Sequence, residues 1–162
     1  MKVTLDTMVL WEWLKYHRAA ADLEQLVQLH EAGSIELAVT ATIRRDVSRD
    51  PMAERLESLP EIGVDEVGGV ARLGFWRLGR DRLADGRFGE WSAGLESPPG
   101  IEDLDHLQAH MLQHRDFFLT TDKAILALAD ELSQRWGIEV RTPARFLQMF
   151  PPSGSSGTEN GA

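Results

Sequence analysis

The sequence contains no cysteine. Thiol catalysis, disulfide bonds and thiolate metal sites are therefore excluded, and the absence fits a reducing compartment, so we expect a cytoplasmic protein. Long apolar runs are also missing, since no stretch approaches the roughly 20 residues that a membrane-spanning helix needs. The N-terminus shows no signal-peptide pattern, because a single Lys is soon followed by Asp6. We therefore expect no membrane association.

Positive charge is scarce in this chain. It carries 17 Lys and Arg residues against 26 Asp and Glu residues, so its formal net charge is −9. A protein this acidic should not hold nucleic acid by bulk electrostatic attraction. A polyanionic substrate would need a local basic patch, a metal ion, or both.

Short apolar stretches alternate with helical patterns along most of the 162 residues. Such alternation indicates a parallel sheet covered on both faces. We therefore predict an α/β fold of three layers, α/β/α, with a central, mostly parallel sheet of four to five strands. One domain is expected over residues 1–150, with an insertion at about 51–99 made of short helical pieces and loops, and a disordered tail at 151–162. The predicted strands are 1–5, 35–39, 117–121 and 138–140, and the predicted helices are 8–16, 22–32, 40–49, 101–113, 123–136 and one that starts at Thr142-Pro143.

Acidic side chains follow two of the predicted strands. Asp6 comes directly after the first strand, and Asp122 follows the strand Phe117–Thr121. Asp46 lies about two turns into the helix after the second strand, and Asp103 opens the helix before the third. Ligands bind beyond the carboxyl ends of the strands in open α/β sheets. In a right-handed parallel arrangement all four carboxylates can face that edge.

Carboxylates gathered in one pocket repel one another and raise one another's pKa values. Mg²⁺ or Mn²⁺ would remove that cost, because these ions prefer carboxylate oxygens and retained waters as ligands. Such an ion can turn a bound water into a nucleophile and neutralise charge on a phosphodiester. Thr7 and Thr121 would orient carboxylates or waters around it. The pattern predicts catalytic and metal-binding roles for Asp6, Asp46, Asp103 and Asp122.

Several of these acids also have a purely structural interpretation. Asp122 lies where a helix N-cap is expected. Asp103 lies in a first helical turn, where the helix dipole favours acidic side chains. Asp46 has the alternative of a solvated position on its helix.

Two other features could bind ligands. His106, His110 and His114 form one stripe on the predicted helix, and histidines at this spacing can bind zinc. The stripe borders the apolar face, so a solvated helix flank is the favoured interpretation. Residues 71–91 interleave arginines with aromatic residues, which suits either RNA contacts or ion pairs with the protein's own acids. The possible RNA contacts are Arg77, Arg80 and Arg82.

Several short motifs together resemble the PIN-domain nucleases. An apolar strand followed by Asp6-Thr7 is similar to the family's opening motif, and Thr40 followed by Asp46 matches the position of its second acid. The remaining similar stretches are Asp103-Leu104-Asp105-His106-Leu107-Gln108-Ala109, Leu119-Thr120-Thr121-Asp122-Lys123 and Thr142-Pro143-Ala144-Arg145-Phe146-Leu147. The resemblance covers about residues 1–50 and 100–148, and it does not cover 51–99.

The resemblance implies a metal-dependent endoribonuclease, for which VapC-type toxins of toxin–antitoxin pairs are the commonest relatives. It implies that the four aspartates hold Mg²⁺ or Mn²⁺, that cleavage leaves 5′-phosphate and 3′-hydroxyl ends, and that the protein is a homodimer with an antitoxin partner. It also gives His106 a packing or hydrogen-bonding role. Asp46 departs from the family, whose second acid is usually Glu.

Two alternatives to a ribonuclease follow from the same residues. One is a catalytically weak PIN-like module that binds RNA or a protein partner, which Asp46 and the acidic charge favour. The other is a different α/β enzyme that uses aspartate. A phosphatase with an Asp nucleophile needs D-x-D where the chain has Asp6-Thr7-Met8, and a phospho-acceptor domain needs a Lys beyond a later strand, whereas Lys123 is adjacent to Asp122.

Overall fold

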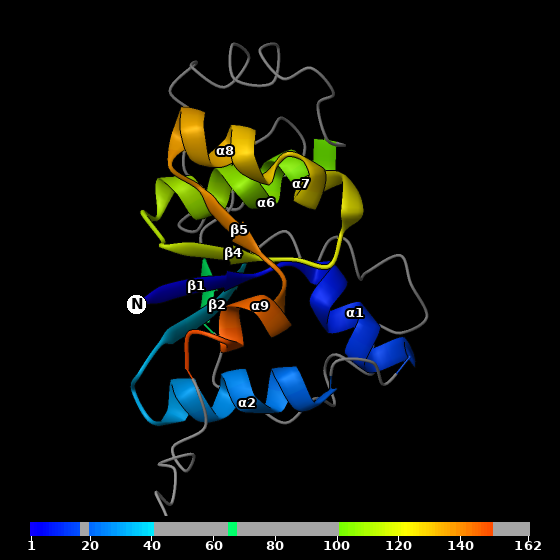
Figure 1. Ribbon diagram of the computed structural model, residues 1–162, viewed down its shortest axis with the longest axis vertical. Helices are drawn as coiled ribbons and strands as arrows, with labels where there is room; N and C mark the ends of the chain where they lie inside the picture. The colour runs from blue at the N-terminus through cyan, green and yellow to red at the C-terminus, as the bar shows by residue number, and fades with distance from the viewer. Residues whose placement is uncertain (17–19, 41–64, 68–100, 151–162) are drawn as a thin grey trace, which may run out of the picture.

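The computed structural model describes residues 1–16, 20–40, 65–67 and 101–150, and the helices and strands are labelled as in Figure 1. The elements follow one another as β1 (Lys2–Leu5), α1 (Thr7–Tyr16), α2 (Ala20–Glu31), β2 (Glu36–Thr40), β3 (Asp65–Val67), α6 (Ile101–Leu112), β4 (Phe117–Leu119), α7 (Lys123–Ala127), α8 (Ala129–Trp136), β5 (Glu139–Arg141) and α9 (Pro143–Leu147).

The five strands form one sheet in the order β3-β2-β1-β4-β5. Every neighbouring pair is parallel. Strand β1 lies at the centre, and its last residue Leu5 pairs with Val39 of β2 and with Leu119 of β4. The carboxyl ends of these three strands therefore lie at one edge of the sheet.

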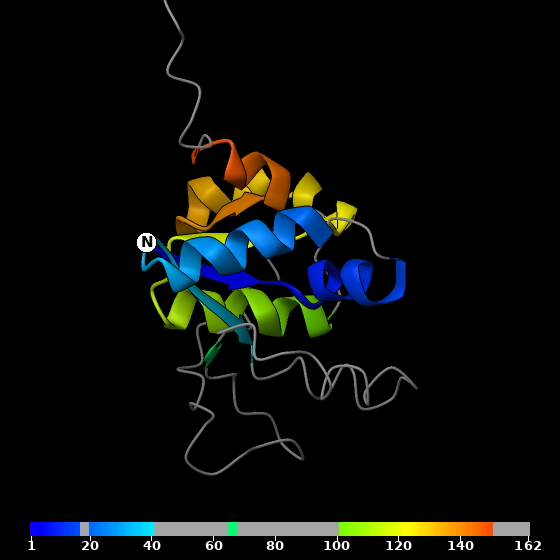
Figure 2. The same ribbon diagram turned by 90° about the horizontal axis from the view of Figure 1, so that it is seen from below.

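Helices cover both faces of this sheet, and α6 and α9 lie on opposite sides of β1 in two perpendicular views (Figure 1, Figure 2). Period-two alternation sends neighbouring side chains to opposite faces. Leu5 and Leu119 join one buried cluster with residues of α1, α2 and α9. Phe118 joins a second cluster with residues of α6, α7 and α8. The predicted three-layer α/β/α fold with a parallel sheet is therefore confirmed.

Local signals set several helix ends. Gly33 follows α2 with φ 71°, and Gly137 follows α8 with φ 69°, a left-handed conformation in which a residue without a Cβ is favoured. The Thr142 hydroxyl accepts a hydrogen bond from the Arg145 amide at 3.3 Å and so caps α9. The helix predicted over 123–136 is in fact two helices, because the backbone departs from helical geometry at Leu128.

The middle of the chain contains a strand that the sequence pattern did not predict. Residues 65–67 lie within the segment expected to hold only helical pieces and loops, yet they form the edge strand β3, which pairs with β2. Asp65 and Glu66 have low strand propensity, so the pairing depends on the backbone of the neighbouring strand. The rest of the predicted insertion, the predicted helix 40–49 beyond Thr40 and the predicted tail lie outside the described residues.

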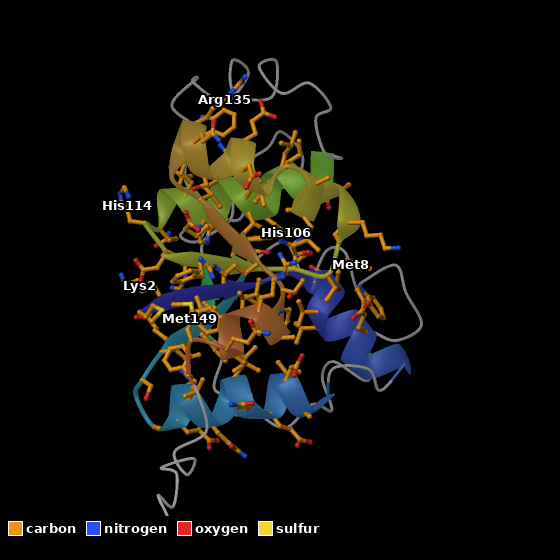
Figure 3. All side chains as sticks on the ribbon, in the orientation of Figure 1. Lys2, Met8, His106, His114, Arg135 and Met149 are labelled. Atoms are coloured by element: carbon orange, nitrogen blue, oxygen red, sulfur yellow. The ribbon has the colours of Figure 1, made fainter. Side chains whose placement is uncertain are left out.

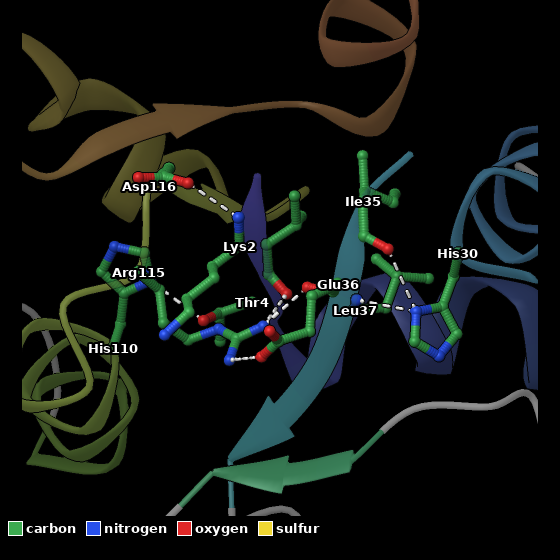
Figure 4. A network of polar contacts seen from close by, with 10 residues as sticks. Lys2, Thr4, His30, Ile35, Glu36, Leu37, His110, Arg115 and Asp116 are labelled. Carbon is green, nitrogen blue, oxygen red and sulfur yellow. Dashed lines mark hydrogen bonds and ion pairs between the residues drawn. The ribbon is translucent and has the colours of Figure 1, made fainter. Parts of the chain in front are cut away.

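The amino ends of β1 and β2 are joined by Arg115, in the loop before β4 (Figure 4). Its guanidinium donates to the carbonyl oxygens of Val3 at 3.2 Å and Glu36 at 2.6 Å. It also donates to the Glu36 carboxylate at 2.8 Å, which lowers the pKa of that carboxyl. Next to this contact, the Lys2 amide donates to Asp116 at 2.7 Å. One buried cation thus satisfies backbone acceptors of two strands.

Arg115→Met should lower the free energy of unfolding by about 2–3 kcal/mol, because it removes charged hydrogen bonds to the buried carbonyl oxygen of Val3 and the partly buried one of Glu36. Urea denaturation measures this loss. Glu36→Gln is the matched control and should cost less than about 1 kcal/mol, because the Glu36 side chain is 49% exposed. Equal losses in the two variants would contradict the role given to the backbone contacts.

Candidate active site at the carboxyl ends of the strands

Asp6 is the residue at which the central strand leaves the sheet, and it is only 2% exposed. Its backbone amide donates to the carbonyl oxygen of Leu119 at 2.9 Å, which extends the pairing of β1 with β4 by one step. Its carboxylate accepts a hydrogen bond from the Thr120 hydroxyl at 2.5 Å. The two contacts to the end of β4 fix both the backbone and the carboxylate of Asp6.

The environment of Asp6 raises the pKa of its carboxyl group. Burial is the largest cause, and the negative charge of Asp122 adds to it. The charge of His106 and the hydrogen bonds from Thr120 and the Thr7 amide act in the opposite direction. Asp6 is thus a desolvated acid beside a second acid, an arrangement in which a cation would be favourable.

Asp122 lies three residues beyond the end of β4 and is half-buried. One of its carboxylate oxygens accepts from the amides of Ala124 at 2.6 Å and Ile125 at 3.3 Å, so it caps α7. Its own amide donates to the Thr120 hydroxyl at 2.9 Å. The structural interpretation of Asp122 as a helix cap is therefore correct, and the same residue also lies close enough to Asp6 to influence its pKa.

His106 occupies the space between α6 and the ends of β1 and β2, toward the end of the sheet where α1 begins (Figure 3). Its Nε2 lies 3.2 Å from the Thr7 hydroxyl, and its Nδ1 forms a short hydrogen bond with the Thr40 hydroxyl. All three side chains are buried. The favoured prediction of a solvated histidine stripe was therefore wrong at this position, because α6 presents His106 to the sheet rather than to solvent.

The other two histidines of the stripe do not join this site. His110 is also buried, and its Nδ1 lies 2.9 Å from the Thr4 hydroxyl. His114 is exposed and lies at the opposite end of the sheet from His106 (Figure 3). Within the ranges that the structure describes, no group of three His, Asp or Glu side chains is arranged to hold a metal ion. The zinc alternative therefore has no support from these residues.

The remaining predicted site residues differ in how the structure places them. Asp103 lies in the first turn of α6 and is half-buried. The Thr7 hydroxyl contacts His106, and the hydroxyl of Thr121 has no hydrogen-bond partner among the described residues. Four predicted residues lie outside the described residues: Asp46, Arg77, Arg80 and Arg82.

Thr120 is the site residue that the sequence reasoning missed. The register pairs Leu5 with Leu119, so the next residues, Asp6 and Thr120, lie opposite each other across two parallel strands. The sequence carried only part of the signal, because period two puts Thr120 on the same face of the strand as Phe118 but does not say which face Asp6 is on. Choosing Thr120 over Thr121 would have required the register, which only the folded sheet provides.

No known family model matches this chain, and no curated protein sequence matches it. The fold is similar to a chain in the crystal structure of VapBC2 from Rickettsia felis bound to a DNA fragment from their promoter. The TM-score is 0.53 at 15% sequence identity, and the match covers 88% of this chain and 98% of that chain. At this level of identity the likeness shows a shared fold.

None of the helices in the described ranges combines the length and the apolar character needed to cross a membrane.

Proposed function

We propose that this protein is a metal-dependent endoribonuclease of the VapC toxin type. The observation that carries the proposal is the buried Asp6 beside Asp122 at the carboxyl ends of adjacent parallel strands. The fold likeness to a chain of VapBC2 supports the same assignment. By extension, we propose RNA as the substrate, an antitoxin as a partner, a homodimer as the assembly and the cytoplasm as the location.

The donor chemistry of this edge fits a hard divalent cation. Asp6 and Asp122 offer carboxylate oxygens, which Mg²⁺ and Mn²⁺ prefer, and a cation would relieve the desolvation and repulsion that raise the pKa of Asp6. In the proposal Asp103 and Asp46 complete the set of ligands. A divalent ion bound there would supply a Lewis acid that stabilises negative charge developing on a phosphodiester.

The chain's own residues would hold the carboxylates in place and would form no covalent bond with the substrate. Thr120 holds the Asp6 carboxylate, and the α7 amides hold the Asp122 carboxylate, so neither side chain needs to reorganise when substrate binds. Because the chain is acidic overall, binding of RNA would depend on a local basic patch, for which Arg77, Arg80 and Arg82 are the proposed residues.

Asp122→Asn should lower the rate of RNA cleavage by about 100-fold or more while leaving the fold intact. Asparagine is as good an N-cap as aspartate, so the α7 amides keep their acceptor and only the negative charge is lost. The measurement is the cleavage rate of a single-stranded RNA with Mg²⁺ or Mn²⁺, with chelator as the blank and with the 5′-phosphate of the products identified.

Asp116→Asn is the matched control, because Asp116 is an exposed aspartate at the opposite end of the sheet, where it accepts from the Lys2 amide. This variant should cleave RNA at the wild-type rate. Cleavage by Asp122→Asn at the rate of Asp116→Asn would refute the assignment of Asp122 to the site.

A catalytically weak module that binds RNA or a protein is the second candidate. It is favoured by the finding that the described residues alone contain no group of three side chains that could hold a metal ion. Calorimetric titration with Mn²⁺ separates the two candidates, since a protein that binds no Mn²⁺ has no means of metal-dependent hydrolysis.

A further inference from the structure

The His106 ring connects three elements that are far apart in the sequence. It projects from α6, and its two ring nitrogens contact Thr7, at the start of α1, and Thr40, the last residue of β2. The contacts span 99 and 66 residues of sequence. A ring nitrogen that carries a proton donates to a hydroxyl and one without a proton accepts from it, so both contacts are satisfied whichever nitrogens carry a proton.

These contacts hold the chain on one side of Asp6, as Thr120 does on the other. Thr7 is the next residue after Asp6, and Thr40 lies opposite Asp6 in the continued register of β1 and β2, one step beyond the pair of Leu5 with Val39. The Thr120 hydroxyl reaches the Asp6 carboxylate from β4. Asp6 therefore lies between two sets of polar contacts. His106 with Thr7 and Thr40 forms one set, and the hydrogen bond from Thr120 forms the other.

A purely apolar side chain at position 106 could not replace this arrangement. Thr7 and Thr40 are buried, and removal of the ring would take one hydrogen-bond partner from each hydroxyl. His106 is also unsuited to act as a metal ligand in this arrangement, because both of its ring nitrogens face threonine hydroxyls.

We propose that His106 is a positioning residue of the candidate nuclease site, which bridges Thr7 and Thr40 and thereby holds the Asp6 carboxylate in place for a divalent cation. This inference rests on the proposed function. It predicts that loss of His106 weakens the binding of the cation itself, in addition to any effect on stability.

The test compares His106→Leu with His110→Leu. His110 is the matched control, because it is equally buried one turn further along α6 and its ring contacts the side chains of Thr4 and Phe118 rather than the acids. Calorimetry measures the dissociation constant for Mn²⁺, and thermal unfolding in chelator measures stability. We expect both variants to lose stability, but only His106→Leu to bind Mn²⁺ about 10-fold or more weakly than the wild type.

Amide variants separate the two arms of the bridge. The side chain of Gln ends at about the reach of Nε2 and keeps a partner for Thr7, whereas that of Asn ends at about the reach of Nδ1 and keeps a partner for Thr40. Because Thr7 adjoins Asp6, His106→Gln should restore most of the Mn²⁺ affinity and His106→Asn should not. If His106→Leu does not fold, Thr7→Val compared with Thr4→Val gives the same test, with weaker Mn²⁺ binding expected only for Thr7→Val.

The possible failures can be told apart. A wild-type protein that binds no Mn²⁺ would overturn the proposed function and this inference together. A wild-type protein that binds Mn²⁺, with His106→Leu binding as tightly as His110→Leu, would overturn the positioning role alone. Equal Mn²⁺ affinity of Thr7→Val and Thr4→Val would likewise overturn the positioning role alone.

Discussion

Replacing Asp6 by Asn is expected to slow RNA cleavage severely and, in the absence of divalent ions, to make the protein more stable at pH 7. The loss of activity should reach about 1,000-fold, because a carboxylate proposed to hold the cation is removed. The gain in stability should be on the order of 1 kcal/mol, because a desolvated charge is removed while an amide oxygen still accepts from Thr120.

The stabilisation should depend on pH in a defined direction. The pKa of Asp6 is raised above its ordinary value of 3.8, chiefly by burial. The folded state therefore binds the Asp6 proton more tightly than the unfolded state does, and wild-type stability from this group falls as pH rises through the folded-state pKa. The advantage of Asp6→Asn should be largest at neutral pH and should disappear as pH falls below 3.8. Urea denaturation in chelator across this range measures it.

Addition of Mn²⁺ should reverse the order of stability. A ligand at 100 times its dissociation constant stabilises the folded state by about 2.7 kcal/mol, and only the wild type should gain this amount. If Asp6→Asn is less stable than the wild type at pH 7 in chelator, the buried carboxylate is not a source of instability. If both proteins gain equally from Mn²⁺, the ion binds elsewhere.

His110 should make the protein lose about 3 kcal/mol of stability as the pH falls from 6.5 to 4. Burial is the main cause that lowers the pKa of His110 from 6.5 to about 4, and the positive charge of Arg115 adds to it, against the charge of Asp116. The unfolded state takes up a proton in this window and the folded state does not, so stability is present above pH 6.5 and is lost on acidification. The rings of His110 and Phe118 lie roughly perpendicular with centroids 5.6 Å apart, so an aromatic ring takes the place of water on this side of the imidazole.

His110→Asn should flatten this pH dependence, because its amide can still contact the Thr4 hydroxyl but does not titrate. His114→Asn is the control and should keep the wild-type slope, since His114 is exposed. Asp6, whose pKa is raised by burial, contributes to the pH dependence with the opposite sign, so the measurement is cleanest when both histidine variants are made in the Asp6→Asn background. An unchanged slope in His110→Asn would contradict the assignment of the transition to His110.

Much of the fold could be predicted from the sequence because its signals are local. The helix end at Gly33 and the helix start at Thr142-Pro143 depend on residues within a few positions of each other, and both were predicted correctly. The short apolar runs likewise predicted β1, β2, β4 and β5. Strand β3 was missed because its formation depends on the exposed edge of β2 rather than on its own composition.

The site was less predictable than the fold, because its contacts join distant parts of the chain. The sequence reasoning placed Asp6 and Asp122 after strands of one parallel sheet, at the same edge, and the structure shows that these two strands are neighbours. The partner of Asp6 is 114 residues away, and the partners of His106 are 99 and 66 residues away. The hydrophobic periodicity within one helix or strand carries no information about contacts between residues so far apart in the sequence.

The sequence by itself determined four of the five described strands, the ends of several helices, and the two acids that follow β1 and β4, since each depends on short-range backbone preferences and on hydrophobic period. Only the tertiary structure decided that Thr120 rather than Thr121 holds Asp6, and that His106 and His110 are buried among threonines. The physical reason is that the packing of the whole sheet fixes the strand register and the rotation of each helix about its axis. A shift of one residue in either would give each side chain a different partner.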